Sequence, residues 1–245
     1  MIQSLQALLW GTVAGSALLL GAGAAWWLRI PRIWVCAIMA FGSGVLISAL
    51  SFELVLEAYQ QGGLAASVAG VLAGAGLYFG ANRLLAWLAA RRHASTPRTQ
   101  DSSGTAIAVG ALIDGIPESV ALGLGVVAGA GINPTMLAAI FISNIPEGLA
   151  STADMKQARR PGRAVLALWG AIAVASGLAA FIGAIALAQM PAEVLAFATA
   201  VAAGGILTMI ADTMIPEAYA VDHDYTGLLV TLGFLSAFTL HAVGG

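Results

Sequence analysis

Eight long apolar runs dominate this 245-residue chain and limit what it can fold into. A helix needs roughly 20 apolar residues to cross the ~30 Å hydrocarbon layer of a membrane. Only 9% of the residues are charged, whereas soluble domains carry roughly 25%. We therefore expect an all-α integral membrane protein with a single transmembrane domain over residues 1–245. Its spans, in chain order, are about 4–28, 34–59, 64–90, 105–130, 134–154, 164–189, 193–220 and 226–244.

The basic residues predict the orientation of these spans. All ten lysine and arginine residues lie in or beside the loops that follow the first, third and fifth spans. Cytoplasmic loops are enriched in these residues, so we expect a multi-pass protein of the cell (plasma) membrane with both termini outside. Pro134 and Pro191 stand at predicted helix starts, where the missing N–H of proline has no cost.

Composition argues against several function classes. No basic tract could follow a phosphate backbone, so we expect no nucleic-acid partner. The single cysteine, Cys36, excludes an intramolecular disulfide and a thiolate metal cage within one chain. We expect no enzyme, because there is no His-Glu-x-x-His segment and Ser43 has no nearby histidine base. The 30 glycines allow close helix contacts, either within one subunit or in a homodimer.

Acidic residues inside the apolar runs are confined to the second, fourth, fifth and seventh spans. A carboxylate at a helix centre costs about 2.5–3.5 kcal/mol on insertion scales, so seven facing lipid would cost on the order of 20 kcal/mol. We therefore expect them to face an interior where water, cations or protons offset this cost. Glu57 and Glu217 lie near span ends, where they could instead reach the membrane surface. The seven are Glu53, Glu57, Asp114, Glu118, Glu147, Asp212 and Glu217.

Three prolines inside the spans each directly precede a glutamate, in Ile-Pro-Glu at 116–118, 145–147 and 215–217. A proline inside a helix removes one hydrogen bond and releases a carbonyl one turn back, here those of Ile113, Ile142 and Asp212. Such carbonyls persist in a membrane only where protein or water satisfies them. Beside a buried carboxylate they supply oxygen ligands. The alternative is that the prolines only kink the helices for packing.

Helical spacing adds a polar group four residues before each glutamate, on the same helix face. The pairs are Glu53 with Glu57, Asp114 with Glu118, Ser143 with Glu147, and Thr213 with Glu217. At 1.5 Å per residue, Glu118 lies about 18 Å into its span and Glu147 about 20 Å into the next, so both lie near mid-membrane. Glu57 lies near the outer end of its span and Glu217 near the inner end. This pattern predicts a central site with acidic groups toward each membrane face.

A short internal repeat links the second and seventh spans. Leu56-Glu57-Ala58-Tyr59 ends one, and Pro216-Glu217-Ala218-Tyr219 ends the other. The basic loops give these two spans opposite directions. Matching segments in opposite directions suggest an inverted repeat of spans 1–3 and 6–8, which is a recurring arrangement in alternating-access transporters.

In these motifs the chain resembles the ZIP (Zrt/Irt-like) family of divalent metal transporters. The family's fourth span carries His-Asn-x-Pro-Glu, similar to Asp114-Gly115-Ile116-Pro117-Glu118 here. Its fifth span carries a His- or Gln-led x-x-Pro-Glu, similar to residues 143–148, and residues 44–58 and 204–218 resemble its second and seventh spans. The resemblance implies eight transmembrane helices in a 3+2+3 inverted repeat, with spans 2, 4, 5 and 7 forming an inner bundle around a metal site.

Several ligand positions depart from the family pattern. Asp114 and Ser143 stand where the family has its leading ligands, Asp212-Thr213 replaces what is often His-Glu, and Glu53 stands at a position that is often His or Ser. The expected site therefore contains only oxygen ligands and the Asn144 amide. Carboxylate, carbonyl and amide ligands favour harder ions such as Mn²⁺, although Zn²⁺ binds most oxygen sites more tightly.

The predicted function is transport of a divalent cation of the zinc, manganese or iron class, with cadmium also fitting. The cation is a substrate, and no prosthetic group is expected. The alternative is a ZIP-shaped protein that moves protons or another cation, or a non-transporting partner that responds to metal. The predicted partners are thus the cation and the lipid bilayer. The expected metal ligands are Asp114, Glu118, Ser143, Asn144, Glu147, Glu53 and Asp212, with Glu57, Thr213 and Glu217 along the pathway.

Overall fold

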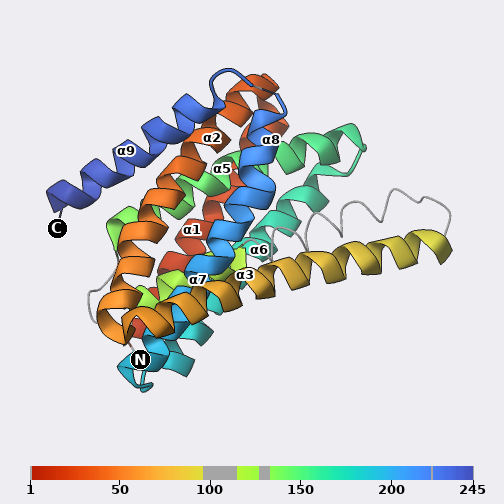
Figure 1. The fold of residues 1–245 in the computed structure, drawn as a ribbon. Helices are drawn as coiled ribbons and strands as arrows, with labels where there is room; N and C mark the ends of the chain where they lie inside the picture. Colours follow the sequence, from red (N-terminus) through yellow and green to blue (C-terminus); the bar gives the residue numbers. More distant parts are fainter. Residues whose placement is uncertain (1, 96–114, 127–132, 222, 245) are drawn as a thin grey trace.

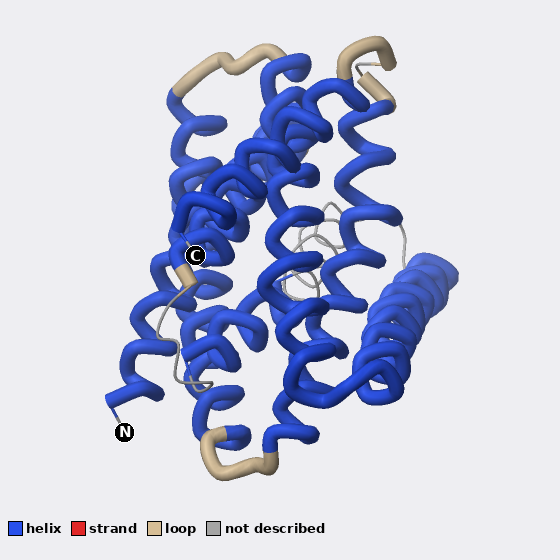
Figure 2. Tube along the Cα trace, turned by 60° about the vertical axis from the view of Figure 1, so that its left-hand side comes forward, coloured by secondary structure: helices blue, strands red, loops and turns tan. Residues whose placement is uncertain are grey.

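Every regular element is a helix in the structure, a computed structural model that describes residues 2–95, 115–126, 133–221 and 223–244 (Figure 1). The elements are α1 (Ile2–Trp27), α2 (Arg32–Ala49), the π-helix η1 (Leu50–Val55), α3 (Leu56–Ser95), the unlabelled helix Gly115–Val126, α5 (Pro134–Gln157), α6 (Gly162–Leu187), α7 (Ala192–Met209), the π-helix η2 (Ile210–Met214), α8 (Ile215–Tyr219) and α9 (Thr226–Gly244). Figure 2 shows most of the connecting loops at two opposite ends of the helices.

Six of the described helical stretches are long and apolar enough to cross a membrane. The second, Arg32–Leu88, has 57 residues, which at 1.5 Å per residue is more than twice the ~30 Å that one crossing requires. It is interrupted at Gly63, whose φ of 72° and ψ of 178° are not helical. Only glycine adopts this conformation readily. The break lies where the sequence predicts one, and Figure 1 shows α2 and α3 running in different directions.

Two predicted helix starts are confirmed. Pro134 is the first residue of α5, and the preceding Asn133 caps the helix by accepting hydrogen bonds from the backbone N–H groups of Thr135 and Met136. Pro191 directly precedes α7. Both prolines occupy positions where a helix has no use for an N–H group.

The two π-helical segments were not predicted from the sequence. In η1 the N–H of Leu56 reaches the carbonyl of Ser51, and in η2 the N–H of Ile215 reaches the carbonyl of Ile210. The segment η1 directly precedes Leu56-Glu57-Ala58-Tyr59, and only Ile215 separates η2 from Pro216-Glu217-Ala218-Tyr219. Segments of this kind occur often at functional sites.

Most residues of the largest cluster of buried apolar side chains come from α2, η1, the helix Gly115–Val126, α5, α7 and η2. These elements belong to the predicted second, fourth, fifth and seventh spans, in which the sequence has its acidic residues. The remaining long helices pack around them, with α3 against α7, α9 against α2, and α6 against α1. Exposed leucine, isoleucine and phenylalanine side chains are frequent on α3, α6 and α9, as expected where helices face lipid.

Two of these helix pairs contact each other through glycine. A Cβ atom at Gly74 of α3 would lie within 3.0 Å of the Val201 carbonyl oxygen of α7, and one at Gly204 of α7 would meet the Val71 carbonyl oxygen of α3 in the same way. The contact between α2 and α9 is equivalent. There, Gly44 faces the Val230 carbonyl and Gly233 faces the Phe41 carbonyl. In both pairs only glycine allows the backbones to approach so closely.

The ends of α1 and α5 lie together at one end of the molecule. The Lys156 ammonium group donates hydrogen bonds to the carbonyls of Ala25 at 3.3 Å and Trp26 at 2.7 Å. The first and fifth predicted spans therefore end on the same side, as the alternation of basic loops predicts.

Candidate functional site

A small cavity of about 30 Å³ lies between α2, α5, α7, η2 and α8. Two glutamates and two hydroxyl groups line it, together with three methionines. We name it the Glu147 cavity, and its lining residues are Met39, Ser143, Glu147, Met209, Thr213, Met214 and Glu217. A cavity of this size has room for one or two water molecules or a single metal ion.

Helical spacing explains how the polar groups reach this cavity. Ser143 and Glu147 stand one turn apart on α5, and Thr213 and Glu217 stand one turn apart across η2 and α8. The Ser143 hydroxyl donates to the Ile140 carbonyl at 2.9 Å, so its oxygen lone pairs can still accept. Side chains that carry carboxylate and hydroxyl groups therefore line one small cavity together.

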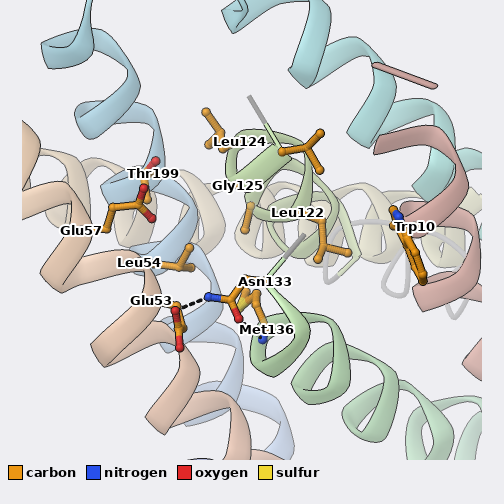
Figure 3. A pocket seen from close by; sticks show the side chains of 12 residues that line it. Trp10, Glu53, Leu54, Glu57, Leu122, Leu124, Gly125, Asn133, Met136 and Thr199 are labelled. Carbon is orange, nitrogen blue, oxygen red and sulfur yellow. Dashed lines mark hydrogen bonds between the residues drawn. The ribbon is translucent and has the colours of Figure 1, made fainter. Parts of the chain in front are cut away.

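A second cavity, also of about 30 Å³, lies between η1, the start of α3, the helix Gly115–Val126 and the start of α5 (Figure 3). We name it the Glu53 cavity. Figure 3 shows Glu53 and Glu57 projecting toward the helix that carries Leu122 and Leu124. Its polar lining residues are Trp10, Glu53, Glu57, Asn133 and Thr199.

Glu53 joins three elements at this cavity. Its carboxylate accepts a hydrogen bond from the Asn133 side-chain nitrogen at the start of α5 (Figure 3). It also accepts one from Nδ1 of His241 near the end of α9, at 2.7 Å. The His241 ring stacks on Phe52, with ring centroids 5.4 Å apart. The Glu53 side chain is 13% exposed, and a carboxylate so largely removed from water needs such partners because isolated charge is costly in an apolar setting.

Glu118 lies deeper in the bundle and is 3% exposed. It precedes Leu122 by one helical turn, so it shares the helix face that lines the Glu53 cavity. Its own side chain lines neither of the two cavities described here. Asp114, expected to pair with Glu118, lies outside the described residues.

Two expected ligands lie apart from these cavities. Asn144 donates from its side-chain nitrogen to the Ala14 carbonyl of α1 at 3.1 Å, so its amide faces α1. Asp212 is exposed and belongs to η2. Within the described part of the chain, no three histidine, cysteine, aspartate or glutamate side chains are close enough to hold a metal ion.

In three of the four predicted pairs the two members line the same cavity: Glu53 and Glu57 line the Glu53 cavity, and the pairs Ser143–Glu147 and Thr213–Glu217 line the Glu147 cavity. The methionines were missed, although the sequence contains a signal for them. Met209, Thr213 and Glu217 follow one another at intervals of four residues, a spacing that places side chains on one helix face.

Replacing His241 with alanine is expected to loosen the end of α9. The change removes a hydrogen bond to a charged acceptor, which contributes about 1.5–3 kcal/mol when it is shielded from water. Because His241 is partly exposed, we expect about 1 kcal/mol. Hydrogen exchange of residues 236–243 should become faster in the variant.

The matched control is His223→Ala. His223 is exposed and contacts Tyr219 edge to face, with ring centroids 4.9 Å apart, so exchange at the end of α9 should not change. Equal exchange in His241→Ala and the unaltered protein would contradict a role for His241 in holding α9.

Comparison of the chain with models of protein families and with curated proteins finds no match.

Proposed function

We propose that this protein transports a divalent cation across a membrane by way of the Glu53 and Glu147 cavities. The observation that carries the proposal is the pair of small, carboxylate-lined cavities within the core of an apolar helical bundle. Carboxylates in a membrane are costly unless a positive charge or water offsets them. A cation that visits both cavities supplies that charge.

The proposed architecture has eight spans. The stretch Arg32–Leu88 supplies two crossings separated at Gly63, and the apolar helix Gly115–Val126 belongs to the fourth. The remaining five candidate helices supply one crossing each. By the basic-loop rule, the Glu53 cavity faces outward and the Glu147 cavity faces the cytoplasm.

An inverted 3+2+3 repeat is supported by the helix contacts. In this scheme the first three spans correspond to the last three, so the α3–α7 contact corresponds to the α9–α2 contact. Both pairs contact through two glycines, each facing a carbonyl of its partner. The π-helices η1 and η2 also occupy corresponding positions.

The two cavities also correspond under this repeat. Glu53, Leu54 and Glu57 line one cavity, and Thr213, Met214 and Glu217 line the other. Each residue of the first set precedes its counterpart in the second set by the same number of positions in the sequence. Transporters built from inverted repeats alternate by exchanging the conformations of their two halves. Two equivalent cavities are the pair of half-sites that such an exchange would use.

The proposed route runs from the Glu53 cavity past Glu118 to the Glu147 cavity. Glu118 lies on the helix face that lines the Glu53 cavity, and Ser143 and Glu147 line the Glu147 cavity. Asn144 and Asp212 lie apart from both cavities, so they are not part of this route, and Asp114 remains a ligand proposed from the sequence alone. Zinc, manganese, iron and cadmium are the proposed substrate class, as the ZIP resemblance implies.

Flux into liposomes tests the proposal. Purified protein in sealed vesicles containing a metal-sensitive dye should admit Zn²⁺, Mn²⁺, Fe²⁺ or Cd²⁺ faster than protein-free vesicles do. K⁺ and proton fluxes measured in the same vesicles provide the comparison. If no divalent cation moves faster than in protein-free vesicles, the proposal is wrong, and a proton or K⁺ flux alone would favour the altered-substrate alternative.

A further inference from the structure

Sulfur-bearing side chains are concentrated at the Glu147 cavity. Three of the chain's seven methionines line it, although it has only seven lining residues. Met39 and Met209 are each 3% exposed and Met214 is 8% exposed. They come from α2, α7 and η2, so they approach the cavity from more than one helix.

The Glu53 cavity has a different chemical character at the corresponding positions. Leu54 corresponds to Met214, and Thr199 corresponds to Met39. Both pairs have the sequence offset that also relates Glu57 to Glu217. One methionine, Met136, lines the Glu53 cavity. Oxygen and amide groups therefore dominate the polar lining there, whereas thioethers and carboxylates meet in the Glu147 cavity.

Packing alone is the competing explanation, since methionine commonly fills irregular gaps in a core. However, these three methionines border a cavity together with two carboxylates and two hydroxyl groups, so they lie beside polar groups and not only against apolar side chains. Cys36 lies about one turn before Met39 on α2 and does not line the cavity. Its Sγ lies 3.9 Å from the Glu217 carbonyl oxygen.

Ligand softness connects this lining to substrate choice. Thioethers bind soft and borderline ions, whereas Mg²⁺, Ca²⁺ and Mn²⁺ prefer carboxylate, carbonyl and water. A site that combines both ligand types holds a softer cation through sulfur and oxygen, and a hard cation through oxygen alone. The expectation of a purely oxygen site, and of a preference for harder ions, is thereby revised.

We propose that the Glu147 cavity is a mixed thioether–carboxylate site that selects softer divalent cations, such as Cd²⁺ and Zn²⁺, over Mn²⁺ and Mg²⁺. This inference rests on the proposed transport function and adds Met39, Met209 and Met214 as specificity-determining residues. The Glu53 cavity then admits divalent cations with little discrimination, and discrimination occurs at the second cavity.

The test compares the unaltered protein with the triple variant Met39→Leu, Met209→Leu and Met214→Leu. Exchange between methionine and leucine is among the best tolerated in cores, and the three single variants replace the triple if it does not fold. Uptake of Mn²⁺ into liposomes is measured while Cd²⁺ competes. The Cd²⁺ concentration that halves Mn²⁺ uptake should rise about ten-fold or more. Residues that only hydrogen-bond to a metal ligand already contribute about 10–100-fold to metal affinity, and a ligand is expected to contribute at least as much.

The control variant is Met155→Leu. Met155 is also 3% exposed and lies in a separate core cluster away from both cavities. It should leave both the Mn²⁺ uptake and the Cd²⁺ competition unchanged. Equal Cd²⁺ competition in the triple variant and the unaltered protein would overturn the inference.

X-ray absorption at the Cd edge supplies a readout that does not depend on transport. The unaltered protein loaded with Cd²⁺ should show sulfur neighbours of the ion, and that signal should fall in the triple variant but not in Met155→Leu. Absence of sulfur neighbours in the unaltered protein would overturn this inference but would not contradict the proposed transport function. Absence of any divalent flux would instead contradict the proposed function.

Discussion

Replacing Glu147 with glutamine is expected to lower divalent-cation uptake by about ten-fold to a hundred-fold or more. Substitution of residues that only hydrogen-bond to a metal ligand typically costs this much in metal affinity or activity, and loss of a ligand should cost at least as much. Glu147 lines its cavity beside Ser143 and across from Glu217. Glutamine keeps the shape and the oxygen acceptor but removes the negative charge that attracts a cation. Glu118→Gln should have a similar effect, because Glu118 is buried along the proposed route.

The same substitutions should not weaken the fold. A carboxylate at the centre of a membrane helix costs about 2.5–3.5 kcal/mol on insertion scales, so its neutral amide removes a destabilising charge. We therefore expect membrane insertion and the thermal unfolding midpoint to be unchanged or improved while flux is lost. Loss of flux with a stable protein indicates a role in transport, whereas loss of both would indicate misfolding.

The control for this pair is Glu193→Gln. Glu193 is an exposed acidic residue in the first turn of α7, outside both cavities. Its substitution should leave flux within about two-fold, as surface changes seldom exceed about 0.5 kcal/mol. Undiminished flux in both Glu118→Gln and Glu147→Gln would contradict the proposed route.

Replacing Gly74 with alanine is expected to separate α3 from α7. The added Cβ would lie within 3.0 Å of the Val201 carbonyl oxygen and also collide with the backbone around Gly205. Both obstacles are backbone, which cannot rotate away as a side chain can. Overpacking of this kind costs about 1–3 kcal/mol, so the thermal unfolding midpoint of the purified protein should fall clearly.

Gly76 provides a matched control two residues along the same helix. A Cβ atom there would meet nothing within 4 Å, so alanine adds only its higher helix propensity. We expect Gly76→Ala to be neutral or to stabilise the protein by about 0.5–1 kcal/mol. Equal unfolding midpoints in Gly74→Ala and Gly76→Ala would show that α3 and α7 are not in close contact.

The positions of most helices could be predicted because their determinants are local. The length of each apolar run determines whether that run can span a membrane. The break at residues 60–63 and the prolines at positions 134 and 191 likewise act on the helices in which they stand or that they adjoin. The predicted spans that carry acidic residues also supply most of the largest buried apolar cluster. Charge in an apolar run must be turned inward wherever the run is placed.

Features that depend on neighbouring helices could not be predicted in this way. Helical spacing places Asn144 on one face of α5, but only the packing of α1 brings that face to the Ala14 carbonyl. Asp212 and Thr213 are adjacent and are both predicted to face the site, although only Thr213 shares a helix face with Glu217 by four-residue spacing. Asp212 lies in η2 and is exposed, whereas Thr213 and Glu217 line the cavity together.

Asn133 uses both atoms of its amide, the oxygen to hold the first turn of α5 and the nitrogen to bind Glu53. Under the proposed function, a cation held by Glu53 would compete with that nitrogen for the carboxylate and so would release a restraint on the first turn. The helix that begins beside the Glu53 cavity, α5 (Pro134–Gln157), also carries Ser143 and Glu147 to the second cavity. We therefore expect cation binding at the first cavity to affect the geometry of the second.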